Sequence, residues 1–133
     1  MKQNIDFQLI LVRFINQLGL PLTARLDYLR EGEDLVVYSL PGGKVKQSFM
    51  DGSQEVHLPF EIAIKSTEQE LANAILWTIN DALADWDIFL PSENESYQFL
   101  GLELTKPFLN DKDEQGYYLY ILDVTAHLEL QKG

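Results

Sequence analysis

The stretch FEIAIKSTEQELANAILWTINDAL, residues 60–83, changes the spacing of its apolar residues halfway along. Up to Ile64 the apolar residues come at every second position, which is typical of a strand with one buried face. Beyond Thr67 they come at every third or fourth position, which indicates an amphipathic helix. The stretch therefore predicts a strand that leads directly into a helix, with the junction at Ser66 and Thr67.

The junction contains two candidate capping boxes. Ser66 is followed by Gln69, and Thr67 is followed by Glu70, so either pair could satisfy free N–H groups at the start of the helix. Glu68 and Glu70 also place negative charge at the positive end of the helix dipole. We expect one of these boxes to fix the beginning of the helix.

The rest of the chain predicts one earlier helix and a set of strands. Apolar residues spaced three and four positions apart from Phe7 to Leu18 predict the first helix, which Gly19 and Pro21 end. Alternating apolar residues predict strands at residues 22–28, 35–40, 44–50, 55–65, 100–104 and 117–130. Because these strands come in blocks, we expect one α+β domain over residues 1–133. Its sheet should be mainly antiparallel, with two helices packed on it.

Glycine and proline place the turns between these strands. Residues 41–43 (PGG) and 51–52 (DG) are both typical of hairpin turns. Pro59 lies inside the 55–65 strand and has no N–H to donate to a neighbouring strand. We therefore expect this strand to lie at an edge of the sheet or to carry a bulge at Pro59.

Two connections are predicted to be irregular. Residues 85–96 read as a loop that Trp86, Ile88 and Phe89 hold against the domain. Residues 110–116 (NDKDEQG) read as an acidic connection into the last strand.

The composition limits the classes of function. The chain has 133 residues, no cysteine and a formal net charge of −11, so disulfides are excluded and nucleic acid phosphates are repelled. Apolar runs are far shorter than the ~18 residues that a membrane span requires. We therefore expect a protein made in the cytoplasm, without a membrane segment.

The titratable side chains form no pattern that is typical of a catalytic site. His57 and His127 lie on the polar faces of their strands and could form a metal site with Glu61 or Glu129, but surface histidines are common. The sequence contains no nucleophile beside a base and no phosphate cradle. We therefore expect no enzyme activity, no catalytic residue, no cofactor and no metal.

The last strand is apolar on more than the face that the core requires. Tyr117, Leu119 and Ile121 lie opposite the face that is committed to the core. One interpretation is a strand buried on both faces and covered by the N-terminal helix. The other is a subunit interface, which Phe49 and Met50 would extend, because tyrosines and aliphatic side chains are favoured there.

Two segments carry a resemblance to a known family. They are SLPGGKVKQSFMDGSQEVHLPFEIAIKSTEQELANAILWTINDAL, residues 39–83, and YYLYILDVTAHLEL, residues 117–130. The pattern of a PGG turn, a DG turn, a strand containing Pro-Phe, a helix containing tryptophan and a long last strand resembles the small "minor capsid" proteins of long-tailed phages and prophages of Gram-positive bacteria. These resemble tail terminators.

The resemblance implies a structural protein of the virion, made in the cytoplasm of the bacterial host. Such a protein forms a homo-oligomeric ring, a hexamer, on the head-proximal end of the tail tube. The ring ends polymerisation of the tube and helps to join tail and head. Its implied partners are the tail tube protein and the head connector protein, and DNA passes through it without specific binding.

The acidity suggests a role if DNA leaves the head through such a ring. A lumen lined with carboxylates would keep phosphates from adhering to its wall. Two acidic segments are candidates for this lining, and the sequence does not choose between them. They are the turn with Glu31, Glu33 and Asp34 and the loop with Asp111, Asp113 and Glu114.

An alternative function belongs to a different class of protein. A monomeric cytosolic α+β module could hold a small ligand between helix and sheet. The tail-terminator interpretation requires oligomers and exposed apolar strand surface, whereas the alternative requires a monomer with an internal pocket.

Overall fold

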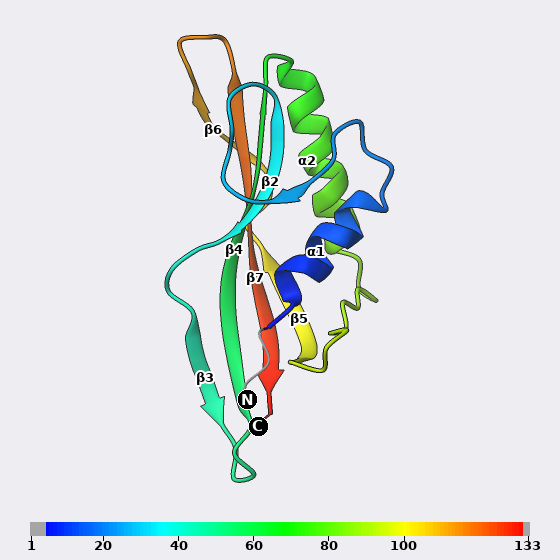
Figure 1. Cartoon of the computed structure of the whole chain (residues 1–133), viewed down its shortest axis with the longest axis vertical. Coiled ribbons are helices and arrows are strands. Elements are labelled where there is room, and N and C mark those ends of the chain that lie inside the picture. The colour runs from blue at the N-terminus through cyan, green and yellow to red at the C-terminus, as the bar shows by residue number, and fades with distance from the viewer. Residues whose placement is uncertain (1–4, 132–133) are drawn as a thin grey trace.

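The computed structural model describes residues 5–131, and within them the chain is an α+β domain with a mainly antiparallel sheet, as expected (Figure 1). The two helices and seven strands of these residues follow one another in this order: α1 (Phe7–Asn16), β1 (Arg25–Leu26), β2 (Asp34–Ser39), β3 (Lys44–Ser48), β4 (Gln54–Ser66), α2 (Gln69–Leu83), β5 (Gln98–Leu104), β6 (Phe108–Lys112) and β7 (Tyr118–Leu130). No helix in this range is long and apolar enough to cross a membrane.

The centre of the sheet is the long antiparallel pair of β4 and β7. Each strand has 13 residues, and their pairing runs without a register shift from Gln54 opposite Leu130 to Ser66 opposite Tyr118. The expectation that Pro59 marks an edge strand or a bulge is therefore wrong. The carbonyl oxygen of Pro59 accepts a hydrogen bond from the Leu40 N–H, at the point where β2 ends. Since β2 stops there, the missing N–H of Pro59 interrupts no ladder.

Two short strands lie end to end along each outer edge of this central pair. β2 and β3 both pair with β4, and β5 and β6 both pair with β7; β1 adds a short parallel pairing to β2. Residues 41–43 are therefore not a hairpin turn, because they carry the chain from β2 to β3 along one edge. Gly43 fits this path closely, since a Cβ atom there would lie 2.8 Å from Leu58 Cδ2. The hairpin turn at residues 51–52 is confirmed, and Gly52 has a φ of +90°.

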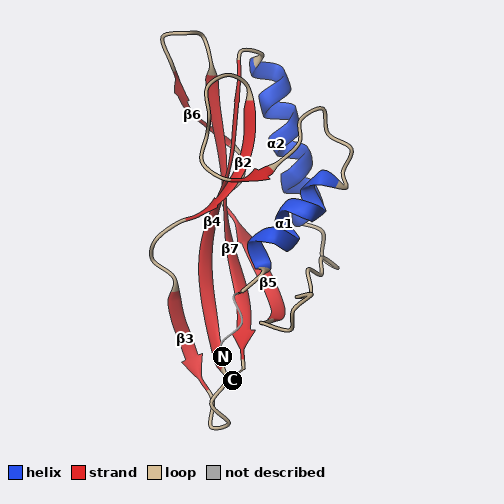
Figure 2. Cartoon of the chain, in the orientation of Figure 1, coloured by secondary structure: helices blue, strands red, loops and turns tan. Residues whose placement is uncertain are grey.

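Both helices pack on the same face of the sheet (Figure 2). The expected apolar faces are confirmed: α1 buries Phe7, Leu11 and Ile15, and α2 buries Leu76 and Ile79. The β4 and β7 side chains that meet the helices, among them Phe60, Ile62, Ile64, Leu122, Val124 and Leu128, form the other half of this core. The predicted packing of two helices on a sheet is therefore observed.

The predicted strand at residues 22–28 is reduced to the two residues of β1. The reason is Asn16 at the end of α1, whose side chain accepts a hydrogen bond from the Ala24 N–H at 2.7 Å and donates one to the Ala24 carbonyl at 3.0 Å. These contacts use the backbone groups that a longer strand would give to a neighbour. Tyr28 is exposed, although the alternation placed it on the buried face.

The strand-to-helix junction is where it was expected, but neither capping box forms. Glu68 is the N-cap residue, and its side chain makes no cap hydrogen bond within residues 5–131. Ser66 is instead the last residue of β4. Its buried hydroxyl accepts a hydrogen bond from the Glu68 N–H at 3.0 Å and donates one to Glu33 at 2.6 Å. Gln69 donates to the Tyr120 hydroxyl at 3.0 Å, so it is not available for a box.

The connections differ from expectation in two places. Residues 85–96 form a loop, but Trp86 and Phe89 are 93% and 66% exposed and do not hold it down. Ile88 packs on the core as predicted, and Asp6 also holds the loop by accepting hydrogen bonds from the Ser92 hydroxyl and the Glu93 N–H. The acidic connection is shorter than predicted, because residues 108–112 form β6.

Candidate functional site

The face of the sheet opposite the helices is the candidate functional surface, and it is called the open face here. No helix of residues 5–131 lies on it (Figure 2). It presents the alternate residues of the central pair, which are Glu55, His57, Pro59, Glu61, Ala63 and Lys65 of β4 and Leu119, Ile121, Asp123, Thr125, His127 and Glu129 of β7. One end of this face is apolar, and the other contains histidines and carboxylates.

The apolar end is a small second cluster. Val36, Ala63 and Ile121 are buried there, and Leu29 and Leu119 are among the half-buried side chains that pack on them. The interpretation that the N-terminal helix covers this face is wrong, because α1 lies on the other side of the sheet. The loop between β1 and β2 supplies the cover, through Leu29.

Burial in this cluster reduces the surface that the predicted interface residues offer to another subunit. Ile121 is only 7% exposed, so it has little surface left for another subunit. Tyr117 and Leu119 are half-buried. Phe108, which is exposed, is paired with Ile121 across β6 and β7.

An acidic pair lies in the middle of the open face. Glu61 and Asp123 are directly opposite each other, and the Tyr38 hydroxyl donates a hydrogen bond to Glu61. Burial, together with hydrogen bonding and repulsion from Glu61, raises the pKa of Asp123 to about 6. Burial and the contact with Glu61 also raise the pKa of Tyr38. Tyr38 therefore remains a neutral hydrogen-bond donor, and Asp123 keeps its proton to a higher pH than an ordinary aspartate does.

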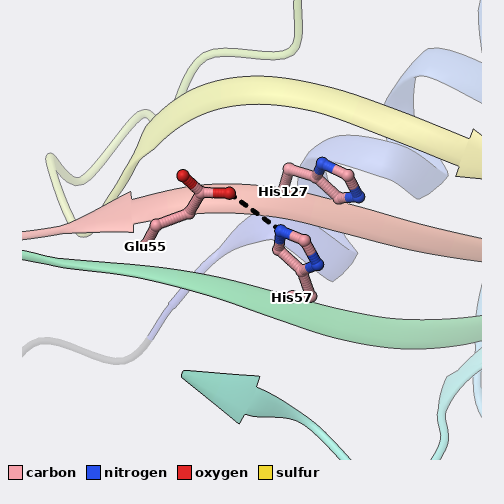
Figure 3. A group of neighbouring side chains, drawn as sticks. All are labelled: Glu55, His57 and His127. Atoms are coloured by element: carbon pink, nitrogen blue, oxygen red, sulfur yellow. Dashed lines mark hydrogen bonds and ion pairs between the residues drawn. The ribbon is translucent and has the colours of Figure 1, made fainter. Parts of the chain in front are cut away.

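The polar end contains a histidine pair (Figure 3). His57 and His127 are directly opposite in the β4–β7 register, and their rings stack with centroids 3.7 Å apart and planes 6° apart. His57 Nε2 lies 2.9 Å from a carboxylate oxygen of Glu55. His127 Nε2 lies 3.2 Å from Glu103, although it makes no hydrogen bond within residues 5–131. The donor atoms of Glu55, His57 and His127 all lie within 4.8 Å of one another.

The sequence anticipated the two histidines as a pair but named the wrong carboxylates. Glu61 was expected beside them, and the structure places it against Tyr38 and Asp123. Glu129 is not among the three residues whose donor atoms lie together, and its carboxylate accepts a hydrogen bond from Gln131. Glu55, two positions before His57, was missed. The spacing of two residues places Glu55 and His57 on one face of β4, and this spacing could have predicted their contact.

The second exposed apolar surface is the tip of the β3–β4 hairpin. Met50 is fully exposed there, and Phe49 is 38% exposed. β3 itself carries Lys44 and Lys46 and is exposed along its length. The hairpin is therefore an apolar tip on a basic strand, in a chain that is otherwise acidic.

A surface groove of about 480 Å³ lies between the end of α2 and β5. It is lined mainly by apolar side chains, and Trp86 beside it is almost fully exposed. Asn80 lines the groove as well, and its buried amide oxygen makes no hydrogen bond within residues 5–131. The acidic residues nearby include Asp85 and Asp87, and a hydrogen bond and repulsion from Asp85 raise the pKa of Asp87. The α2–β5 groove thus combines an apolar lining, an unpaired amide oxygen and charges of both signs, since Lys106 lines it as well.

The pattern of the chain and this architecture agree with one family. The model of the bacteriophage tail terminator protein matches residues 14–130, which is most of the chain. This chain belongs to the bacteriophage tail terminator family. The family is structural, so the role of this chain is structural too, as a component of a phage tail.

The solved structures agree on the fold of this tail terminator. A chain in "Virion of native gene transfer agent (GTA) particle" has a TM-score of 0.54 to this chain and 16% sequence identity. The likeness covers 80% of this chain and 78% of that one, and at this identity it shows the fold alone. No curated protein sequence matches the chain.

The acidic segments of the tail terminator lie together at one end of the sheet. Glu33 and Asp34 lie beside Lys65 and Ser66 at the end of β4, and residues 112–117 form the turn beside Tyr118 at the start of β7. Figure 1 shows both turns at the end opposite the β3–β4 hairpin.

The members of this acidic end differ in exposure. Asp34 is buried and bonded to Arg25, so it offers little free charge. The other five predicted lumen residues, Glu31, Glu33, Asp111, Asp113 and Glu114, are exposed.

Proposed function

We propose that this tail terminator assembles into a hexameric ring on the head-proximal end of the tail tube. There it ends polymerisation of the tube and joins the tail to the head. The observation that carries the ring is the fully exposed Met50 at the tip of the β3–β4 hairpin. A large apolar side chain held in solvent on an ordered hairpin is typical of a surface that another molecule covers.

The contact is proposed to be head to tail between neighbouring copies. A ring requires two different surfaces on each subunit that fit each other, since one surface that binds itself gives a closed dimer. The β3–β4 hairpin and the α2–β5 groove are two such surfaces. The first is apolar and basic, and the second is apolar with Asp85 and Lys106 in its lining. Lys44 and Lys46 would then lie near Asp85 and Asp87, which opposes the repulsion between subunits of charge −11.

The half-buried Tyr117 and Leu119 are proposed to extend the subunit contact from the open face. Their exposed fractions are smaller than that of Met50, so their contribution should be smaller. The acidic end of the sheet is proposed to face the passage for DNA. Exposed carboxylates of both turns would line it together, so the two candidate segments are not alternatives in this arrangement.

The ring is tested by sedimentation velocity over a range of concentrations. Wild type should form an oligomer, and Met50→Glu should shift it towards monomer without a change in circular dichroism. Gln47→Glu, which adds the same charge to an exposed position of the same hairpin, is the matched control and should keep the oligomer. A wild-type protein that stays monomeric at every concentration would contradict the ring and favour the small-ligand module.

The capping role is tested with the tail tube protein of the same phage. Adding the wild-type chain to polymerising tube protein should shorten the tubes in electron micrographs, and Met50→Glu should not. Tubes of unchanged length with oligomeric wild type would contradict capping while leaving the ring in place.

A further inference from the structure

We propose that Glu55, His57 and His127 form a binding site for a divalent transition-metal ion, with Zn²⁺ as the best fit. The site lies on the open face, at the end of the β4–β7 pair that is near the hairpin (Figure 3). It is independent of the ring, because its three donors come from one chain.

The positions of the donor atoms are the first reason. One carboxylate oxygen and one nitrogen from each imidazole lie within 4.8 Å of one another. Around a tetrahedral Zn²⁺ with bonds of about 2.0–2.1 Å, the donors lie about 3.3 Å apart. The donors of this site therefore need to approach by no more than about 1.5 Å, which side-chain rotation can supply.

The stacked rings must turn for a shared ion to bind. In a parallel stack the nitrogen lone pairs lie in two separate planes, and an ion between them would meet neither pair directly. Rotation about the Cβ–Cγ bond of one imidazole corrects this, and this torsion has a broad energy well. The backbone does not need to move, because the β4–β7 register already places the two histidines directly opposite each other.

The surrounding charges favour a cation. Glu129 is directly opposite Glu55, and Glu103 lies 3.2 Å from His127 Nε2. Like charges directly opposite across strands are destabilising, so a cation here would relieve the repulsion between Glu55 and Glu129. Lys44 is paired with His57 across β3 and β4 and is the basic residue that acts against binding, but it is exposed.

The types of donor indicate the kind of metal. Imidazole nitrogen with one carboxylate suits Zn²⁺, Cu²⁺, Ni²⁺ and Co²⁺, whereas Mg²⁺ and Ca²⁺ require mainly oxygen. Glu103 is placed to be a fourth ligand or to orient His127 through its second nitrogen, as carboxylates often do in zinc sites. An ion bound here would join the two central strands and stabilise the folded state.

The experiment uses Co²⁺ and Zn²⁺ with the purified chain. Co²⁺ should give the visible absorption of a tetrahedral complex, and Zn²⁺ should displace it at one ion per chain. His57→Ala, His127→Ala and Glu55→Gln should each weaken Zn²⁺ binding by at least about tenfold in calorimetry, because even residues that only support ligands cost that much. Circular dichroism shows whether each variant is folded.

Glu129→Gln is the matched control, since it removes the same charge from the same face beside the site. If it weakens Zn²⁺ binding as much as Glu55→Gln does, the ion is held by general negative charge and the site is wrong. Absence of Co²⁺ absorption in the wild type would also overturn the proposal, and would leave the histidines as partners of Glu55 and Glu103 alone. Repeating the titration with Met50→Glu separates the site from the ring: unchanged affinity is expected, and a loss would place the metal at a subunit contact.

Discussion

The two faces of the β4–β7 pair differ completely, although the same two strands supply both. On the helix side, Ile62, Ile64, Leu122 and Val124 are fully buried. On the open side, the alternate residues include Glu61, Asp123, Thr125 and His127, which are half-buried, with Ala63 and Ile121 as buried exceptions. The helix face thus forms the main core, whereas the open face keeps most of its polar side chains partly exposed.

The difference assigns most of the folding free energy to one face of the sheet. Apolar burial against α1 and α2 contributes most of the folding free energy, because each large buried side chain contributes about 1.5–3 kcal/mol. The open face instead places similar polar groups opposite each other, such as the carboxylates of Glu61 and Asp123 and the stacked rings of the two histidines. Such pairs add little to the stability of the fold. Changes on the helix face should therefore alter stability strongly, and changes on the open face should alter pH response and binding.

The largest expected effect comes from the helix face. Leu122→Ala should lower the free energy of unfolding by about 2–5 kcal/mol, because it removes a fully buried side chain and leaves a cavity. Thr125→Ala, three positions away on the open face, should change it by less than about 1 kcal/mol. Urea denaturation followed by circular dichroism measures both. Equal losses from the two variants would break the distinction between the faces.

A middle-sized effect is expected at the junction between β4 and α2. Ser66→Ala should cost about 1–3 kcal/mol, because it leaves the Glu68 N–H and the Glu33 carboxylate without their buried hydroxyl partner. Thr67→Ala should cost far less, since Thr67 is exposed. Thermal melts of the two single variants check this. A larger loss from Thr67→Ala would restore a capping box built on Thr67 and Glu70.

The sequence predicted the parts that depend on local spacing. The alternation around Ile62 and the helical spacing around Leu76 are set by neighbouring residues. The buried face of the strand and the buried face of the helix were therefore assigned correctly. The pairing partner of β4 could not be predicted in this way, because β7 is more than 50 residues further along the chain. Pro59 was therefore given to an edge strand, and residues 41–43 were read as a hairpin turn.

The candidate site was predicted only in part, because it too depends on the pairing of distant strands. His57 and His127 were seen as members of polar faces, but their contact with each other follows from the β4–β7 register, which local patterns do not fix. Glu55 shares the face of His57 through its spacing of two along β4. Ile121 was given to an interface because the loop that covers it, through Leu29, has no apolar period of its own. Met50 was named as an interface residue. The structure shows it exposed beside the DG turn, and its contact with another subunit stays a prediction.

The smallest of these effects is a pH response on the open face. The pKa of Asp123 is raised from 3.8 to about 6, first by burial and then by Glu61. Between these two pH values the folded state holds a proton that the unfolded state has lost. Stability from this group is therefore present at low pH and falls as the pH rises from about 4 to about 6.

Asp123→Asn should remove this loss, because an amide stays neutral and can donate a hydrogen bond to Glu61. At pH 7 the variant should be more stable than wild type by about 1 kcal/mol, which allows for screening by solvent at this half-buried site. At pH 4 the two should melt at similar temperatures. Asp111→Asn, which removes an exposed carboxylate of β6, is the control and should leave the slope between pH 4 and 6 unchanged. If Asp123→Asn is the less stable protein at pH 7, the ionised Asp123 is held by favourable contacts, and the open face is less frustrated than its geometry indicates.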